Sequence, residues 1–177
     1  MHQALFLDRD GVVNRDDGYT HKWCPSIINP DIVPLIASYK KAGYLIIVIT
    51  NQSGIGRGYY SELDFLQFMD SMQAYLAESD VQFDDYMWCA CNPEVSTCTN
   101  RKPNPGLFFK AAERYDIDLC SSVMVGDKDT DMIAAERAGV GVRILFDVDS
   151  LASGFSSAPR FRIIQSLKDV CLLNLEE

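Results

Sequence analysis

The chain has 177 residues, of which 47% are hydrophobic and 23% are charged, and its formal net charge is -9. This length and composition predict a single globular domain over residues 1–177, and the negative charge argues against general binding of nucleic acids or anionic membranes. No segment approaches the ~20 apolar residues of a membrane helix, and charge follows the first residues too soon for a signal peptide. We therefore expect a monomeric cytoplasmic protein whose partner is a small molecule.

Short apolar runs alternate with longer amphipathic segments along the chain. The runs lack the polar alternation of half-exposed strands and predict buried parallel strands at residues 4–7, 44–49, 86–88, 123–125 and 142–146. Capping residues, a proline at a first helical position and glycines beyond the last turns predict helices at residues 30–42, 61–78, 104–115 and 129–138. Residues 150–159 read as a polar loop before a last short strand and helix. This alternation predicts an α/β fold, a doubly wound, mostly parallel sheet with helices on both faces.

Polar or charged residues follow four of the predicted strands directly. In a doubly wound sheet the ligand crevice lies outside the carboxyl ends of the strands, so these residues are expected to meet. They are Asp8 and Asp10 after the first strand, Thr50, Asn51 and Ser53 after the second, Arg101 and Lys102 after the third, and Asp127, Lys128 and Asp131 after the fourth.

This set of residue types predicts phosphoryl transfer through a covalent aspartyl-phosphate. Asp8 is the expected nucleophile, and Mg²⁺ is the expected cofactor, held by the carboxylates of Asp8 and Asp127 and by the backbone carbonyl of Asp10. The Asp10 carboxyl group is expected to protonate the leaving oxygen and later to accept a proton from water. Thr50 and Lys102 supply a hydroxyl group and an ammonium group for the phosphoryl oxygens.

The segments FLDRDGVVN, DDGY, TNQSGIGRG, RKPNPG and MVGDK resemble, in this order, motifs of the haloacid dehalogenase-type phosphatases. The likeness covers residues 5–146 and is greatest to the heptose-bisphosphate phosphatases, a subfamily related to histidinol phosphatase. It implies a Rossmann-like core and removal of the 7-phosphate of D-glycero-D-manno-heptose 1,7-bisphosphate. It also implies that the substrate is contacted by Asp16, Asp17, Gly18, Tyr19, Thr50, Asn51, Gln52, Ser53, Arg101 and Lys128.

Spacing along the chain bears on the substrate as well. Predicted helices and strands use up most of the residues between Asp8 and Thr50 and between Thr50 and Lys102, which leaves no room for a large cap domain. Selectivity then falls to the loops at residues 14–26, 52–60 and 89–105. Arg57 and Arg101 are placed to bind a second phosphate or hydroxyl groups, which favours a bisphosphorylated sugar. Histidinol phosphate and other small sugar phosphates remain alternatives.

Several parts of this pattern have other readings. DRDG is half of a calcium loop, but Tyr19 stands where the final glutamate belongs. GIGRG follows the second strand with the wrong glycine spacing for a nucleotide-binding loop, so it is expected to shape a turn near phosphate. Receiver-type signalling domains use similar acidic residues, Mg²⁺, a hydroxyl group and a lysine, but have no use for a proton donor such as Asp10. Asp131 is either a supporting carboxylate or an acid suited to a helix's first turn.

Three cysteines precede Arg101 and Lys102. The resemblance implies a structural zinc site in this loop, formed by C-x-H and C-x-C in many relatives. Here Cys89, Cys91 and Cys98 occupy three of the places and Asn100 the fourth. Three thiolates are good zinc ligands, but an asparagine amide is a poor one and structural sites normally have four protein ligands. We therefore expect free thiols in a loop without Zn²⁺, with a structural Zn²⁺ ion as the alternative.

Overall fold

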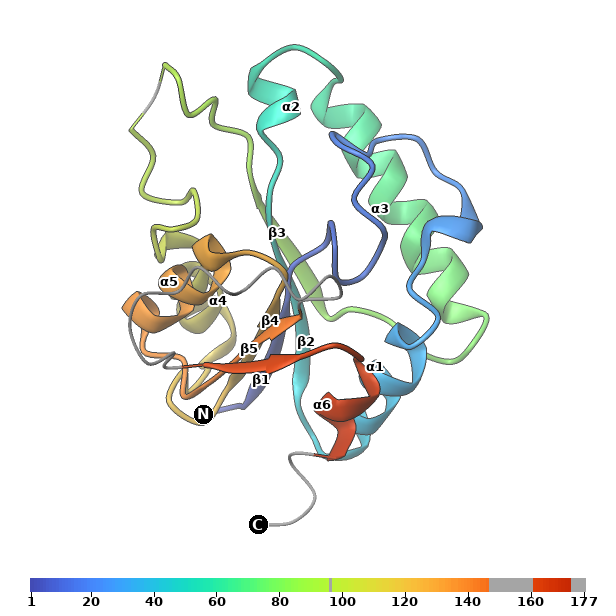
Figure 1. The fold of residues 1–177 in the computed structure, drawn as a ribbon, viewed down its shortest axis with the longest axis vertical. Helices are drawn as coiled ribbons and strands as arrows, with labels where there is room; N and C mark the ends of the chain where they lie inside the picture. The colour runs from blue at the N-terminus through green and yellow to red at the C-terminus, as the bar shows by residue number, and fades with distance from the viewer. Residues whose placement is uncertain (96, 147–160, 173–177) are drawn as a thin grey trace.

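A computed structural model describes residues 1–95, 97–146 and 161–172, drawn as a ribbon in Figure 1. Its centre is a six-stranded sheet in the order β3-β2-β1-β4-β5-β6, in which every neighbouring pair is parallel. The strands are β1 (Ala4–Leu7), β2 (Leu45–Asn51), β3 (Asp85–Cys89), β4 (Val123–Gly126), β5 (Val142–Phe146) and β6 (Arg162–Ile164). The predicted parallel α/β sheet is confirmed.

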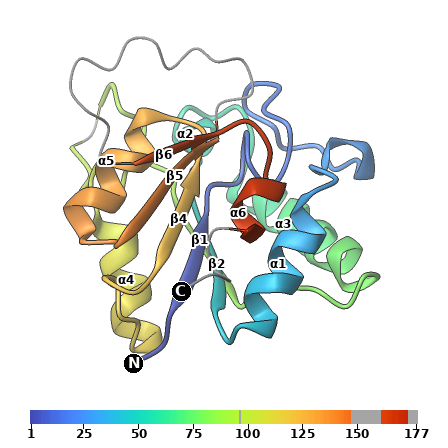
Figure 2. The ribbon, with the colours of Figure 1, turned by 60° about the horizontal axis from the view of Figure 1, so that its bottom comes forward.

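Helices cover both faces of this sheet. They are η1 (Pro25–Ile27), α1 (Ile32–Lys41), α2 (Ser53–Gly56), α3 (Glu62–Ala77), α4 (Gly106–Tyr115), α5 (Asp129–Ala138) and α6 (Lys168–Leu172). Figure 2 shows α4 and α5 on one side of the strands and α1, α3 and α6 on the other. The sheet is therefore doubly wound, as expected from the alternation of strands and helices.

The side chains of β1 explain why its sequence is apolar throughout. Leu5 and Leu7 pack in the core on the side of α1 and α3, whereas Ala4 and Phe6 pack on the side of α4 and α5. All four are 0% exposed. Because successive residues of a strand point to opposite faces, a strand covered on both faces shows no polar alternation.

Most element ends follow from local capping. Ser61 closes a capping box with Asp64 at the start of α3, as predicted. Two helices begin two residues later than their expected starts at residues 30 and 104. At α1 the side chain of Asn29 accepts a hydrogen bond from the Asp31 backbone at 3.1 Å, which holds a turn before the helix. At α4 the side chain of Asn104 donates to the Cys98 carbonyl oxygen at 2.8 Å and so belongs to the preceding loop.

The connections between the first three strands contain no inserted domain within the described residues. The β1–β2 connection carries η1 and α1, and the β2–β3 connection carries α2 and α3. Short α2 was not predicted as a helix, and the polar loop predicted at residues 150–159 lies outside the described residues. None of the helices in the described ranges is both long enough and apolar enough to span a membrane.

Candidate active site

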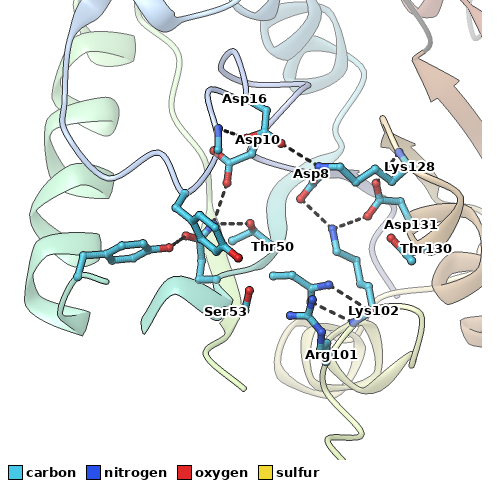
Figure 3. Close-up of a pocket in the computed structure, with 15 residues that line it drawn as sticks. Asp8, Asp10, Asp16, Thr50, Ser53, Arg101, Lys102, Lys128, Thr130 and Asp131 are labelled. Atoms are coloured by element: carbon cyan, nitrogen blue, oxygen red, sulfur yellow. Dashed lines mark hydrogen bonds and ion pairs between the residues drawn. The ribbon is translucent and has the colours of Figure 1, made fainter. Parts of the chain in front are cut away.

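The carboxyl ends of β1, β2 and β4 meet in a pocket near the middle of the sheet (Figure 3). Here the winding of the chain reverses, because the helix after β1 covers one face and the helix before β4 covers the other. The pocket is lined by Asp8, Asp10, Asp16, Gly18, Tyr19, Thr50, Asn51, Gln52, Ser53, Tyr60, Arg101, Lys102, Lys128, Thr130 and Asp131. Polar residues predicted from four separate strand ends thus come together in one place.

Lys102 is a buried cation at the centre of the site. Its Nζ donates to Asp8 Oδ1 at 2.8 Å and to the Ile49 carbonyl oxygen at 2.8 Å, and it forms an ion pair with Asp131 Oδ1 at 2.6 Å. Burial by itself would lower the pKa of Lys102, but the charges of Asp131 and Asp8 outweigh it and raise that pKa. Lys102 therefore stays protonated and presents a fixed positive charge beside the Asp8 carboxylate.

Side-chain hydrogen bonds to the backbone hold Lys102 and Asp131 in place. The Asn51 side chain accepts from the Lys102 backbone N–H and donates to the Lys102 carbonyl oxygen, both at 3.0 Å, and so joins the end of β2 to the RKP loop. Asp131 Oδ2 accepts from the Lys128 backbone N–H at 3.1 Å at the start of α5. Asp131 thus fits both of its predicted readings, because it caps the helix with one oxygen and pairs with Lys102 through the other.

Three carboxylates, Asp8, Asp127 and Asp131, have oxygen atoms within 4.8 Å of one another. In the described part of the chain, buried Asp127 Oδ1 has no hydrogen-bond partner. Burial, followed by the charge of Asp8, raises the pKa of Asp127 to about 7. Burial also raises the pKa of Asp8, although Lys102 opposes it. An orphaned oxygen among crowded carboxylates is the environment that a hard divalent cation relieves, so these residues fit Mg²⁺.

Gly11 makes this crowding sterically allowed. Its φ is +94°, and a Cβ atom at this position would lie 2.1 Å from Asp127 Oδ2. Any side chain here would therefore displace the Asp127 carboxylate. The glycine of DRDG is thus required by a close approach and by a left-handed backbone conformation.

Lys128 and Asp16 form the upper edge of the pocket in Figure 3. Lys128 Nζ donates to Asp16 Oδ2 at 3.0 Å and lies 3.4 Å from Asp127 Oδ2. Burial opposes the charged form of Lys128, but the charge of Asp127 and the contact with Asp16 raise its pKa. Burial works to raise the pKa of Asp16, but the hydrogen bonds from Lys128 and from the Gly18 backbone, together with the charge of Lys128, lower it. The 14–26 loop is therefore tied to the fourth strand end by an ion pair.

Thr50 and Arg101 present donors toward the pocket. Thr50 is 1% exposed, and its Oγ1 accepts from Gln52 Nε2 at 2.9 Å, which leaves the hydroxyl hydrogen for another acceptor. Buried Arg101 Nη1 has no partner among the described residues. Unpaired donors around Asp8 suit an anion with several oxygen atoms, such as a phosphoryl group.

Two predicted substrate contacts do not line the pocket. Asp17 accepts from Arg15 Nε at 2.7 Å on the surface, and Arg57 Nη1 donates to Glu94 at 2.9 Å. Their roles in substrate binding stay predictions. Sequence reasoning missed two lining residues, Tyr60 and Thr130. Thr130 stands within GDKDTD, and Tyr60 ends the 52–60 loop that was expected to contribute to selectivity, so in both cases the segment was predicted but the residue was not.

The cysteine loop lies just before Arg101. Cys91 and Cys98 form a disulfide, with Cα atoms 6.5 Å apart, and Cys89 Sγ lies 3.4 Å from Cys98 Sγ. The expectation of free thiols in this loop is confirmed for Cys89 and is wrong for Cys91 and Cys98. The loop folds back over seven residues and brings this pair within disulfide reach, which spacing alone does not reveal.

Protein purified without chelator is expected to contain less than stoichiometric zinc. Although the sulfur atoms of Cys89, Cys91 and Cys98 lie within 4.8 Å of one another, Asn100 is a poor fourth ligand, and structural zinc sites normally have four protein ligands. Elemental analysis measures the metal content, with a Cys24→Ser, Cys120→Ser variant as a control outside the loop. Near-stoichiometric zinc that is lost in a Cys89→Ser, Cys98→Ser variant would overturn the expectation of a metal-free loop.

Comparisons with known proteins agree with this chemistry. A family model described as HAD-hydrolase-like matches residues 99–169. The chain is 42% identical to D-glycero-alpha-D-manno-heptose-1,7-bisphosphate 7-phosphatase of Burkholderia mallei, over 90% of this chain and 89% of that one. It is 39% identical to D-glycero-beta-D-manno-heptose-1,7-bisphosphate 7-phosphatase of Vibrio cholerae, over 94% of this chain and 93% of that one.

A solved structure shares the whole architecture. The D,D-heptose 1,7-bisphosphate phosphatase of B. bronchiseptica, crystallised with magnesium and phosphate, superposes with a TM-score of 0.84 at 32% identity and covers 96% of both chains. The signalling receiver alternative is set aside by these relatives. Given such identity over nearly all of both sequences, this chain belongs to the D-glycero-D-manno-heptose-1,7-bisphosphate 7-phosphatase family of HAD-like hydrolases and is a phosphatase.

Proposed function

We propose that this phosphatase removes the 7-phosphate of D-glycero-D-manno-heptose 1,7-bisphosphate through an aspartyl-phosphate on Asp8. The observation that carries the chemistry is the Asp8 carboxylate held against Lys102 Nζ at 2.8 Å on the pocket floor. The substrate is supported by the relatives, whose names give heptose 1,7-bisphosphate as the compound they act on.

In the first half-reaction, an Asp8 carboxylate oxygen attacks the phosphorus atom and the bond from phosphorus to the sugar oxygen breaks. Asp10 gives a proton to that departing oxygen. The Lys102 ammonium and the Thr50 hydroxyl bind the phosphoryl oxygens as their charge develops. Arg101, with an unpaired Nη1, is available for the same oxygens or for the second phosphate.

In the second half-reaction, Asp10 accepts a proton from a water molecule that attacks the phosphorus atom. The bond between phosphorus and Asp8 then breaks, which releases inorganic phosphate and restores both carboxyl groups to their starting states. Asp8, Asp127 and the backbone carbonyl of Asp10 are the residues that would hold Mg²⁺. When bound, the ion supplies positive charge that reduces repulsion between Asp8 and the phosphate dianion.

Replacement of Asp10 by asparagine is expected to lower kcat by about 10²–10⁴-fold, because the amide cannot give or take the proton. Mg²⁺ half-saturation should stay unchanged, since the metal ligand at this position is the backbone. Steady-state kinetics with Mg²⁺ titration measures both quantities. A kcat within a factor of a few of the parent would remove Asp10 from the proposed mechanism.

A panel assay of phosphate release tests the substrate. It compares both anomers of the heptose bisphosphate with histidinol phosphate, the heptose 1-phosphate and the heptose 7-phosphate. We expect the highest kcat/KM with a bisphosphate and no release from the 1-phosphate. The relatives do not select the anomer, since they include phosphatases named for the alpha form and for the beta form. Faster hydrolysis of histidinol phosphate would contradict the proposal.

The remaining sequence predictions belong to this proposal. They are a single domain over residues 1–177, a monomer, a cytoplasmic location and no nucleic-acid or membrane partner. The net charge of -9 supports the last of these, since it opposes binding to polyanions.

A further inference from the structure

Arg9, the residue before Asp10, holds one side of the Asp10 carboxylate by hydrogen bonds. Arg9 is 0% exposed, and its guanidinium lies over the Phe68 ring at 4.6 Å from the ring centre. Its Nη2 donates to both Asp10 oxygens, at 2.8 and 2.7 Å, and also to the Thr20 carbonyl oxygen at 2.6 Å. Because the buried guanidinium is packed against this ring, Arg9 holds its side of the Asp10 carboxylate in a fixed position.

Gln52, which lies between β2 and α2, holds the same carboxylate from another side. Its Nε2 donates to Asp10 Oδ2 at 3.0 Å and to Thr50 Oγ1 at 2.9 Å, and both groups line the pocket. The two amide hydrogens of Gln52 are thereby used. The side chain is 2% exposed, so its carbonyl oxygen needs a donor within the protein.

Tyr60 supplies that donor. Its hydroxyl group donates to Gln52 Oε1 at 2.6 Å. Burial raises the pKa of Tyr60 to about 12, so the phenol keeps its proton. The ring is fixed as well, because it packs against Gly54, where a Cβ atom would lie 2.2 Å from Tyr60 Cε1. A hydrogen-bonded chain thus runs from a buried phenol through one amide to Asp10.

The direction of these hydrogen bonds decides which end of the Gln52 amide faces Asp10. An amide can present either its oxygen or its nitrogen to Asp10, and an oxygen there would repel the carboxylate. With the phenol donating to Gln52 Oε1, the amide nitrogen must face Asp10. Asn14 Nδ2 also donates to Asp10 Oδ1, at 3.0 Å. The carboxylate is then held by Arg9, Asn14 and Gln52 in one orientation, as a group that both gives and accepts a proton in one catalytic cycle requires.

We propose that Tyr60 is a positioning residue for the proton-transfer steps and acts through Gln52 on Asp10. The proposal rests on the proposed role of Asp10 in the hydrolysis of the phosphate ester. Tyr60 is not expected to touch the transferred phosphoryl group. It therefore affects kcat and leaves the binding of substrate and of inorganic phosphate unchanged.

Tyr60→Phe is the first test, since it removes one oxygen atom and keeps the ring. We expect kcat to fall about 3–10-fold, the usual effect of one buried hydrogen bond. KM, inhibition by inorganic phosphate and Mg²⁺ half-saturation should stay as in the parent. Tyr44→Phe is the matched control, because Tyr44 precedes β2 at the opposite end of the sheet and should leave kcat unchanged. An unchanged kcat in Tyr60→Phe, or a loss no larger than that of the control, would refute the proposal.

A double-mutant cycle shows through which group Tyr60 acts. In an Asp10→Asn background, adding Tyr60→Phe should change kcat by less than a factor of about two, because the positioned carboxylate is already gone. A full additional loss, or weaker inhibition by phosphate, would mean that Tyr60 acts through Thr50 and would overturn the proposal. An Asp10→Asn variant of near-parental kcat would instead remove the proposed role of Asp10.

Gln52→Leu is a second test of the same link, in case Tyr60→Phe does not fold. This variant removes the amide that connects Tyr60 with Asp10, and it should lower kcat by at least as much as Tyr60→Phe does. Adding Tyr60→Phe to Gln52→Leu should produce no further loss, and a further loss would refute action through Gln52. Thermal melting followed by circular dichroism checks that each variant is folded.

Discussion

Asp8→Asn is expected to abolish steady-state phosphate release, a loss of roughly 10⁴-fold or more in kcat, because the amide cannot form the aspartyl-phosphate. The fold should survive the change. Burial raises the pKa of Asp8, which means that the protein environment opposes its charge, and asparagine is neutral at the same volume. Lys102 keeps its ion pair with Asp131.

Phosphate release by the purified variant measures the effect, and circular dichroism checks the fold. Asp116→Asn is a matched control, because Asp116 lies beyond α4 and pairs with the N-terminus at 3.0 Å. Its left-handed backbone, with φ at 50°, accepts asparagine. If independent preparations of Asp8→Asn all hydrolysed the substrate clearly above background, Asp8 would be excluded as the nucleophile.

Removal of divalent metal ions is also expected to abolish activity, and added Mg²⁺ should restore it. Without the ion, the crowded oxygens of Asp8, Asp127 and Asp131 oppose the approach of a phosphate dianion. Dialysis against EDTA followed by Mg²⁺ titration measures the dependence. EDTA saturated with Mg²⁺ is the control, since it leaves free magnesium in place.

Two variants distinguish the metal ligands in this titration. Asp127→Asn should raise the Mg²⁺ concentration needed for half-maximal activity, because Asp127 Oδ1 is the buried oxygen without a partner. Asp10→Asn should not. Full activity in metal-stripped buffer would contradict the metal requirement, and an unchanged titration in Asp127→Asn would remove that residue from the ligand set.

The core of the site could be predicted from sequence because each part of it is a local signal. An apolar run marks a strand, and the polar residue after it marks that strand's carboxyl end. Once the sheet is parallel, Asp8, Thr50 and Lys102 must converge, although Lys102 and Asp8 are 94 residues apart. The helix caps at Ser61 and Gly139 were local signals too, and the structure has both.

Side chains on the loops could not be placed in this way. Asp17 and Arg57 pair with Arg15 and Glu94, outside the pocket lining. The partner of a loop charge depends on which other loop lies beside it, and that is a property of the folded chain. The pairing of Cys91 with Cys98 has the same origin, since only the folded loop decides which thiols meet.

The sequence by itself determined the parallel sheet, the strand ends that form the site and the groups available for phosphoryl transfer, because periodicity and capping act between neighbours in the chain. Only the tertiary structure decided how those groups are held. Arg9 stands between two aspartates in the sequence, and the folded chain buries it against the ring of Phe68. Tyr60 reaches Asp10 through Gln52, which is 42 residues from Asp10. Such contacts depend on packing between distant segments, and no local pattern records them.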